Sequence, residues 1–261
     1  MNNFKKVIEF NLSFGLPHFN KEQKNILEDN PKLSDLRVSL CDEEVTELND
    51  AFKNFDFIEV IDALTDELYV IYGAASSFGF DIDYYLGILL EDNGVDTNYK
   101  KTLNYHYKKM EYNIYNYKSF LKHDNILKEL INDNIRYLLD KLNEKIKELQ
   151  DYKDNKNYPG IKFSLVYLLY YTYTLGIVMG IDLDNSFDIV HMSNMSKLCS
   201  SEEQAKQTVE WYIKNEDRYD SPSYRLSDND QYWVVFNQST GKILKNKDYT
   251  SANFNSMIYN K

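Results

Sequence analysis

The spacing of apolar residues divides most of the chain into helices. Between residues 57 and 79 apolar side chains recur every three or four positions, as expected for one face of a helix. The same periodicity predicts helices over residues 36–53, 84–92, 124–152 and 202–214, and a polar helix over 21–28 that ends at Asn30-Pro31. Gly and Pro are scarce, at 9 and 4 of 261 residues. The pattern therefore predicts an all-α protein, a helical bundle.

Three segments depart from this pattern. Residues 163–181 carry no charge over about the length that crosses a bilayer, but their tyrosines and threonines favour a buried core helix over a transmembrane one. Residues 231–236 and 242–245, separated by NQSTG, predict a small C-terminal β-hairpin. Residues 99–118 are rich in Tyr, Lys and Asn, and an exposed helix or connector is favoured over a nucleic-acid patch.

Charge and cysteine content narrow the partners and the compartment. The net charge is −11, with 30 Lys and Arg against 41 Asp and Glu, which argues against a nucleic acid polymer or an anionic membrane as partner. Two cysteines and four scattered histidines predict neither a disulfide framework nor a zinc site. No secretory signal is apparent at the N-terminus. A cytoplasmic protein is expected.

Two acidic clusters lie on the first two long predicted helices. Within each cluster the residues are three or four positions apart, which places them on one helix face; the clusters are Glu43, Glu44, Glu47 and Glu59, Asp62, Asp66. Carboxylates that face each other raise each other's pKa and destabilise the fold unless a cation neutralises them. Oxygen ligands of this kind suit Mg²⁺ and a phosphorylated substrate.

The alternative interpretation is two solvated acidic faces in a chain that is acidic throughout. Glu59 has an alternative of its own, because Asp56 followed by Glu59 is typical of a capping box that opens a helix. The acids of the second helix form a stripe directly beside its apolar stripe, close to a packed seam. That position favours ligands, because an unpaired acid there would be costly.

These residues also carry a family resemblance. The motif Glu43-Glu44-x-x-Glu47 followed by Glu59-x-x-Asp62, with DELYVIYG behind it, resembles the all-α nucleoside triphosphate pyrophosphohydrolases. That superfamily includes the MazG-like proteins, the all-α dUTPases and phosphoribosyl-ATP pyrophosphohydrolase. The segments FGLP at 14–17, VHMSNMSK at 190–197 and GKILK at 241–245 are similar to MazG-like segments.

The resemblance implies hydrolysis of a nucleoside triphosphate to the monophosphate and pyrophosphate, with Mg²⁺ or Mn²⁺ as cofactor and nucleotide-pool sanitation as a role that would fit. It implies four metal ligands, namely Glu44, Glu47, Glu59 and Asp62. Glu43 would orient or deprotonate the attacking water, and Lys197 would stabilise charge in the transition state. The implied substrate contacts are Asn194, Lys197, Lys242, Lys245 and Asp66. For Lys245, as for Arg225, an ordinary surface role is an equal alternative.

The chain also matches itself at an offset of 101 positions, which places Glu43 on Glu144 and Glu47 on Glu148. We infer a tandem duplication: a first repeat at 1–100, a degenerate second repeat at 101–200 and a tail at 201–261, packed as one globular unit. Four of the six acids are lost in the second repeat, where Lys145, Gly160, Phe163 and Tyr167 stand at the positions of Glu44, Glu59, Asp62 and Asp66. The apolar replacements are expected to fill the interface between the repeats. Further homo-oligomerisation stays open.

Two other functions remain as alternatives. Loss of the acids from the second repeat favours a non-catalytic nucleotide sensor or scaffold. The fold would equally serve phosphoribosyl-ATP hydrolysis.

Overall fold

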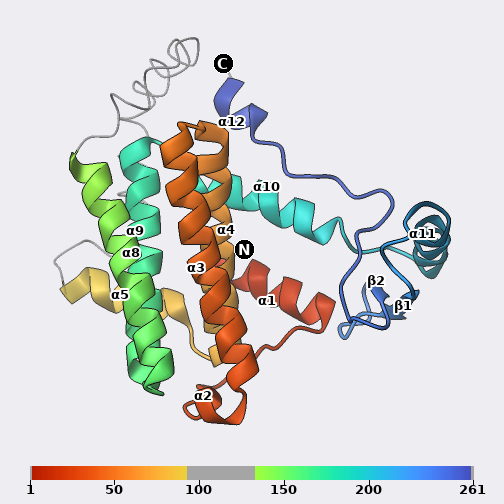
Figure 1. Ribbon diagram of the computed structural model, residues 1–261, viewed down its shortest axis with the longest axis horizontal. Coiled ribbons are helices and arrows are strands. Elements are labelled where there is room, and N and C mark those ends of the chain that lie inside the picture. The colour runs from red at the N-terminus through yellow and green to blue at the C-terminus, as the bar shows by residue number, and fades with distance from the viewer. Residues whose placement is uncertain (1, 93–132, 260–261) are drawn as a thin grey trace. The chain divides into compact units, whose positions relative to one another are not determined.

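The computed structural model describes residues 2–92 and 133–259 (Figure 1). It divides into two compact units. The bundle unit comprises Phe19–Phe187 and Phe254–Lys261, and the tail unit comprises Met1–His18 and Asp188–Asn253. Residues 99–118, for which a connector is expected, lie outside the described residues. The repeat boundaries at 100 and 200 stay a prediction.

The bundle unit is built from two helical hairpins. Helix α3 (Pro31–Asn54) packs on α4 (Phe57–Phe78), and α8 (Asp133–Asp154) packs on α9 (Tyr158–Met179). The hairpins join through α3 against α8 and α4 against α9, as the ribbons of Figure 1 show. The remaining helices are α2 (Ile26–Asp29), α5 (Ile82–Asp92), α12 (Asn255–Tyr259) and the start of α10 (Leu183–Met195). The predicted all-α bundle is confirmed.

Two predicted helix boundaries in this unit are wrong. The polar helix expected over 21–28 covers only Ile26–Asp29, and the first acidic helix begins at Pro31 instead of residue 36. Pro31 occupies the first turn of α3, where its missing N–H is tolerated because that amide has no partner within a helix. The Asn30 side chain accepts a hydrogen bond from the N–H of Leu33 and caps the helix.

The two hairpins repeat each other residue by residue. Helices α4 and α9 have identical bounds once the offset of 101 is applied, and the hydroxyls of Tyr72 and Tyr173, that far apart in the chain, meet at 3.1 Å. The turns also correspond. Each hairpin turn holds a non-glycine residue with positive φ, Phe55 (57°) or Lys156 (54°). The second helix then ends in a left-handed glycine, Gly79 or Gly180. Residues 101 positions apart therefore occupy equivalent places in the two hairpins, as the inferred duplication requires.

Helix α9 contains residues 163–179 of the uncharged segment 163–181. Its length and composition would suffice to cross a membrane, and 56% of its most apolar window is buried within the protein. It packs against α8 and α4, as the core helix of a bundle does. The expectation that its new apolar side chains fill the interface is only partly right. Leu168 is fully buried, whereas Phe163 is 47% exposed.

The tail unit combines the N-terminal segment with residues 188–253. It contains α1 (Asn3–Phe14), the end of α10, α11 (Glu202–Asn215) and an antiparallel pair of strands, β1 (Pro222–Leu226) and β2 (Trp233–Asn237). The predicted hairpin is confirmed at its turn end, because the N–H of Asn237 donates to the carbonyl of Lys242 and the N–H of Leu244 to that of Val235, both at 2.8 Å. The longer partner of β2 is a strand that the sequence did not predict. Residues 222–226 pair with the whole of β2 through a turn at 227–230, while the predicted partner pairs with its end, where Phe236 faces Ile243.

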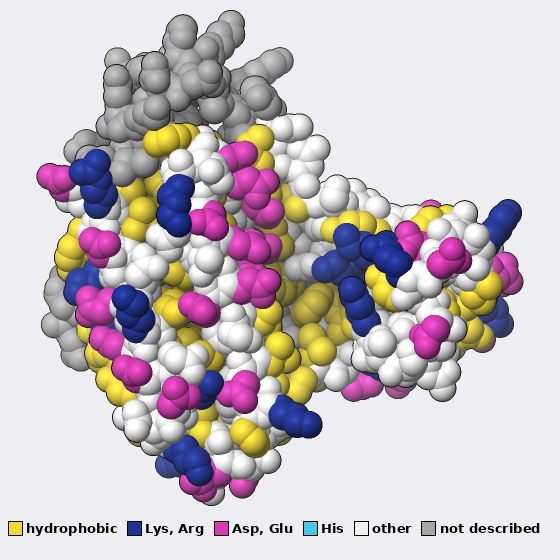
Figure 2. All heavy atoms as spheres, viewed as in Figure 1, with side chains coloured by type: hydrophobic (Ala, Val, Ile, Leu, Met, Phe, Trp, Pro, Cys, Tyr) yellow, Lys and Arg dark blue, Asp and Glu magenta, His cyan; other side chains and the backbone are white. Residues whose placement is uncertain are grey.

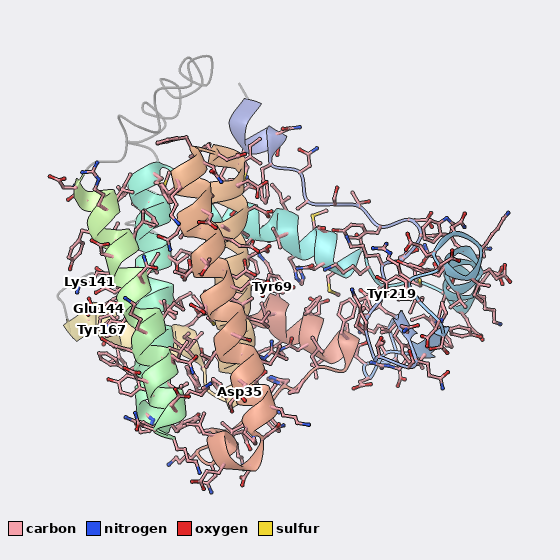
Figure 3. The ribbon with its side chains drawn as sticks, viewed as in Figure 1. Asp35, Tyr69, Lys141, Glu144, Tyr167 and Tyr219 are labelled. Carbon is pink, nitrogen blue, oxygen red and sulfur yellow. The ribbon has the colours of Figure 1, made fainter. Side chains whose placement is uncertain are left out.

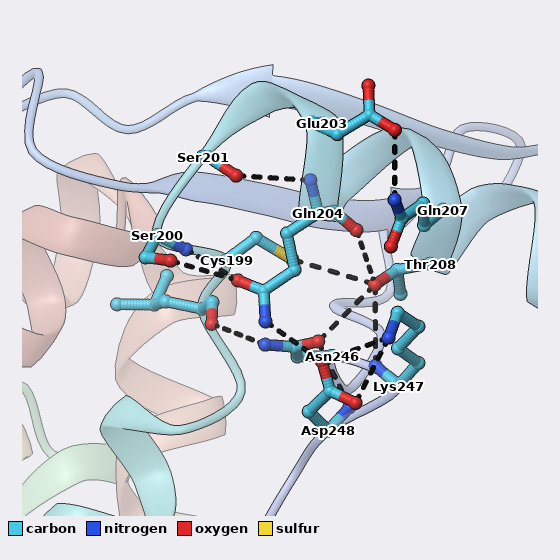
Figure 4. Close-up of polar contacts among 11 residues, drawn as sticks. Cys199, Ser200, Ser201, Glu203, Gln204, Gln207, Thr208, Asn246, Lys247 and Asp248 are labelled. Carbon is cyan, nitrogen blue, oxygen red and sulfur yellow. Dashed lines mark hydrogen bonds and ion pairs between the residues drawn. The ribbon is translucent and has the colours of Figure 1, made fainter.

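Polar contacts fix the segment after β2 against α11 (Figure 4). Asn246, which is 6% exposed, donates from its side chain to the carbonyl of Leu198 at 3.0 Å and accepts from the N–H of Asp248 at 3.1 Å. Gln204, in the first turn of α11, donates to the Asp248 carboxylate at 3.0 Å. This network holds residues 246–248 beside α11 and beside the segment that follows α10.

Candidate functional site

Both acidic clusters lie in the bundle unit, on α3 and α4. Glu43, Glu47 and Glu59 are exposed, and Glu44, Asp62 and Asp66 are partly buried. Figure 2 shows a column of Asp and Glu side chains over this pair of helices. The capping box considered for Glu59 forms only in part: the Asp56 carboxylate accepts from the N–H groups of Ile58 and Glu59, but the N–H of Asp56 donates to the carbonyl of Ala51. That cap uses the backbone of Glu59 and leaves its carboxylate available.

The electrostatics show that the two clusters act on each other. Burial, followed by the charges of Asp66, Glu47 and Glu43, raises the pKa of Glu44 to about 8. Burial, followed by the charges of Glu59 and Glu47, raises the pKa of Asp62. One carboxylate oxygen of Glu44 is buried without a hydrogen-bond partner among the described residues. The region is therefore short of positive charge.

The donor set fits a divalent cation, although the side chains do not converge. Within residues 2–92 and 133–259, no three His, Cys, Asp or Glu side chains stand close enough together to hold a metal ion. A hard cation would nevertheless satisfy the Glu44 oxygen that lacks a partner and offset the repulsion that raises both pKa values. The carboxylates are also the ligand type that Mg²⁺ and Mn²⁺ prefer.

The predicted phosphate-binding residues lie in the tail unit. The ammonium of Lys197 donates to the Asn194 side-chain oxygen at 2.5 Å. The backbone N–H of Asn246 donates to the carbonyl of Lys197 at 3.1 Å, which brings the segment of Lys245 beside that of Lys197. Figure 2 shows Lys and Arg side chains gathered on this unit. Two segments singled out by resemblance thus meet, although fifty positions of chain separate them.

The remaining cationic candidates differ in their contacts. Lys245 lies over the ring of Tyr249 at 4.3 Å, and Lys242 over the ring of Tyr219 at 5.6 Å; both lysines are exposed. Arg225 is different, because its guanidinium donates to the carbonyl of Phe14 at 2.7 Å and pairs with Asp228 at 3.3 Å. Arg225 therefore anchors the turn after α1, a role that the sequence did not indicate.

Sequence reasoning missed a buried polar group between the hairpins. Glu67 is 0% exposed, neither of its oxygens has a hydrogen-bond partner among the described residues, and burial raises its pKa to about 8. The Thr172 hydroxyl lowers that pKa in part, but it donates to the carbonyl of Leu168 at 2.8 Å. The sequence did contain a signal of this burial, because Glu67 follows Leu64 by three positions and so falls on the apolar stripe of α4.

A second missed group is Arg37 on the inner face of α3. It is 8% exposed, and its Nε donates to the Ser77 hydroxyl at 2.8 Å. Burial lowers the pKa of this guanidinium, and the buried thiol of Cys41 lies one turn further along the same face. The signal for Arg37 was again its place on the apolar stripe, four positions before Cys41.

A duplicated helical hairpin with carboxylates on its paired helices is the architecture of the MazG-like all-α nucleoside triphosphate pyrophosphohydrolase superfamily. Comparison with protein families gives the same answer. The phosphoribosyl-ATP pyrophosphohydrolase profile matches residues 13–93 and 122–194, one segment for each repeat. The chain belongs to this family, and membership implies a nucleotide pyrophosphohydrolase.

The chain is also similar to a protein of Acanthamoeba polyphaga mimivirus that is described as uncharacterized. The two are 35% identical over 260 residues, which cover 98% of this chain and 95% of the viral protein. The likeness therefore spans both repeats and the tail. No solved structure matches the chain.

Proposed function

We propose that the protein is a divalent-metal-dependent nucleoside triphosphate pyrophosphohydrolase that releases a nucleoside monophosphate and pyrophosphate. The observation that carries this proposal is the excess of negative charge around Glu44, whose pKa is raised to about 8 by burial and by neighbouring carboxylates. Carboxylates packed in this way repel one another and destabilise the fold unless a bound cation offsets the repulsion. Their presence therefore supports a cationic ligand.

In this proposal Glu44, Glu47, Glu59 and Asp62 hold Mg²⁺ or Mn²⁺. The ion, when bound, supplies a positive charge that polarises the phosphate chain and lowers the pKa of water. Glu43 accepts a proton from the attacking water, and its exposure leaves it open to solvent. Asp66 adds a carboxylate near Glu44 that orients a ligand or faces the sugar or base.

In the same proposal the family resemblance assigns the phosphate contacts to Lys197, Lys242 and Lys245. Lys197 carries the charge that stabilises the phosphate oxygens, and its bond to Asn194 holds the ammonium in one direction. Lys245 and Lys242 are secondary contacts, and the aromatic rings beneath them restrict their motion. The substrate is a nucleoside triphosphate; phosphoribosyl-ATP is the second candidate, because the matching family profile carries that name.

The test is product analysis with Mg²⁺ over a panel of ribonucleoside, deoxyribonucleoside and modified triphosphates together with phosphoribosyl-ATP. Monophosphate and pyrophosphate should appear, and Glu47→Gln and Asp62→Asn should reduce kcat by about 100-fold or more. The matched control is Glu148→Gln, which removes the same group from the equivalent position of the second repeat and should keep activity. Binding of nucleotide without turnover of any compound would instead establish the sensor.

A further inference from the structure

In the second repeat, a lysine, two carboxylates and two aromatic rings contact one another at the positions where the first repeat has its acids. Helix bounds and turn geometry match at an offset of 101, so Lys145 stands at the position of Glu44 and Glu148 at that of Glu47. Phe163 and Tyr167 stand at the positions of Asp62 and Asp66. Figure 3 shows Glu144 and Tyr167 on this face of α8 and α9.

One ammonium group lies at the centre of these side chains. The Nζ of Lys145 donates to both carboxylate oxygens of Glu148, at 2.7 and 2.8 Å, and lies 4.0 Å from Glu144. The same atom lies 5.2 Å from the ring centre of Phe163 and 5.2 Å from that of Tyr167. Two carboxylates and two aromatic faces therefore surround a single cation.

The contrast with the first repeat is one of charge balance. There Glu44 has a buried oxygen without a partner among the described residues, and its neighbours are further carboxylates. In the second repeat Glu148 is paired with Lys145, and Glu144 with Lys141. The Lys145 side chain is only 9% exposed, so its charge is held in place and poorly screened, whereas that of Lys141 is 27% exposed.

We propose that the second repeat retains a cation site whose occupant is the tethered ammonium of Lys145, in place of a free ion. The ligand class of the site is a primary alkylammonium, because one face offers carboxylate oxygens and the other offers ring faces, which a strongly hydrated divalent ion would not use. This charge and these rings keep the second hairpin folded without metal. The inference concerns stability and does not depend on the proposed hydrolysis.

Chemical rescue tests it on the full chain. Lys145→Ala removes the ammonium and leaves its site empty, and we expect the Tm to fall by roughly 5 °C, as for loss of a partly buried ion pair. n-Propylammonium should restore much of that loss in a saturable manner, whereas 1-propanol and Mg²⁺ should not. Lys141→Ala is the matched control: it removes the more exposed lysine of the same face and should change the Tm by about 1 °C at most.

A second variant separates charge from packing. Lys145→Met keeps the length of the side chain without its charge, and it should remain destabilised and gain nothing from the amine. Equal Tm values for Lys145→Ala and Lys141→Ala would overturn the proposal. So would recovery of stability in Lys145→Met, or rescue of Lys145→Ala by the alcohol as well as by the amine.

Discussion

Neutralising Glu44 should stabilise the metal-free protein, and the effect should depend on pH. Burial and the charges of Asp66, Glu47 and Glu43 raise the pKa of Glu44 from 4.5 to about 8. A carboxyl whose pKa is higher in the folded than in the unfolded state contributes fully to the free energy of unfolding below the unfolded pKa. That contribution is lost as pH rises through the folded pKa. The wild-type protein without metal should therefore lose stability between about pH 4.5 and pH 8.

The magnitude follows from the size of that change. At about 1.4 kcal/mol for each pKa unit, the full change would amount to roughly 5 kcal/mol. Glu44 is only partly buried, and solvent and side-chain relaxation reduce the figure to about 2 kcal/mol. For a chain of this size that corresponds to a Tm increase of about 4–8 °C for Glu44→Gln at pH 8.

The assay is thermal unfolding in chelator at pH 5 and pH 8, repeated with excess Mg²⁺. Glu44→Gln should raise the Tm at pH 8, change it little at pH 5, and weaken the stabilisation that Mg²⁺ gives the wild type. Asp42→Asn is the control, because it removes one charge from an exposed side chain on the same helix. An unchanged or lower Tm at pH 8, or the same gain for Asp42→Asn, would refute the electrostatic reasoning.

Three further predictions concern stability, each measured by thermal or denaturant unfolding. Glu67→Leu should stabilise the metal-free protein at pH 8 by about 2 kcal/mol, because it removes two buried oxygens without partners and repeats the leucine found at position 168; destabilisation would show that the carboxyl has a structural partner. Gly79→Ala should cost at least about 3 kcal/mol, since φ is +80° and the new Cβ would lie 1.9 Å from the carbonyl oxygen of Lys21. Gly241→Ala, with φ of +71° and no atom within 4 Å, should cost only about 1 kcal/mol, and equal losses would contradict the role of the close approach. Asn246→Ala should cost about 2–3 kcal/mol because it leaves buried partners of the network unbonded, whereas the exposed Gln207→Ala should be nearly neutral.

Much of the fold was predictable because its signals are local or repetitive. The 3.6-residue period of α4 and the glycine at its end depend only on neighbours in the chain, and the predicted end near Gly79 is where the structure places it. The offset of 101 was readable because the two repeats keep turns of the same length. The β-strands show the limit: the pairing across NQSTG was predictable from its turn residues, whereas the partner at 222–226 was missed because strand pairing depends on contacts that the sequence pattern does not fix.

The candidate site was predictable only in part. The acids of α3 and α4 lie on neighbouring helices as expected, and their mutual effect on the pKa of Glu44 and Asp62 agrees with facing clusters. The sequence also showed that Lys145 replaces an acid. It did not show that the ammonium of Lys145 would lie between Glu148 and two aromatic rings, because that depends on how α8 packs on α9.

The sequence by itself determined the helices, the duplication and the family, because periodicity, turn residues and motif spacing are properties of short stretches of chain. The tertiary structure decided which charges meet. It left Glu67 buried between the hairpins without a partner among the described residues, and it gave Lys145 two carboxylates. The physical reason is that burial and charge pairing arise when distant helices pack, and the energies of charged groups change most steeply with those contacts.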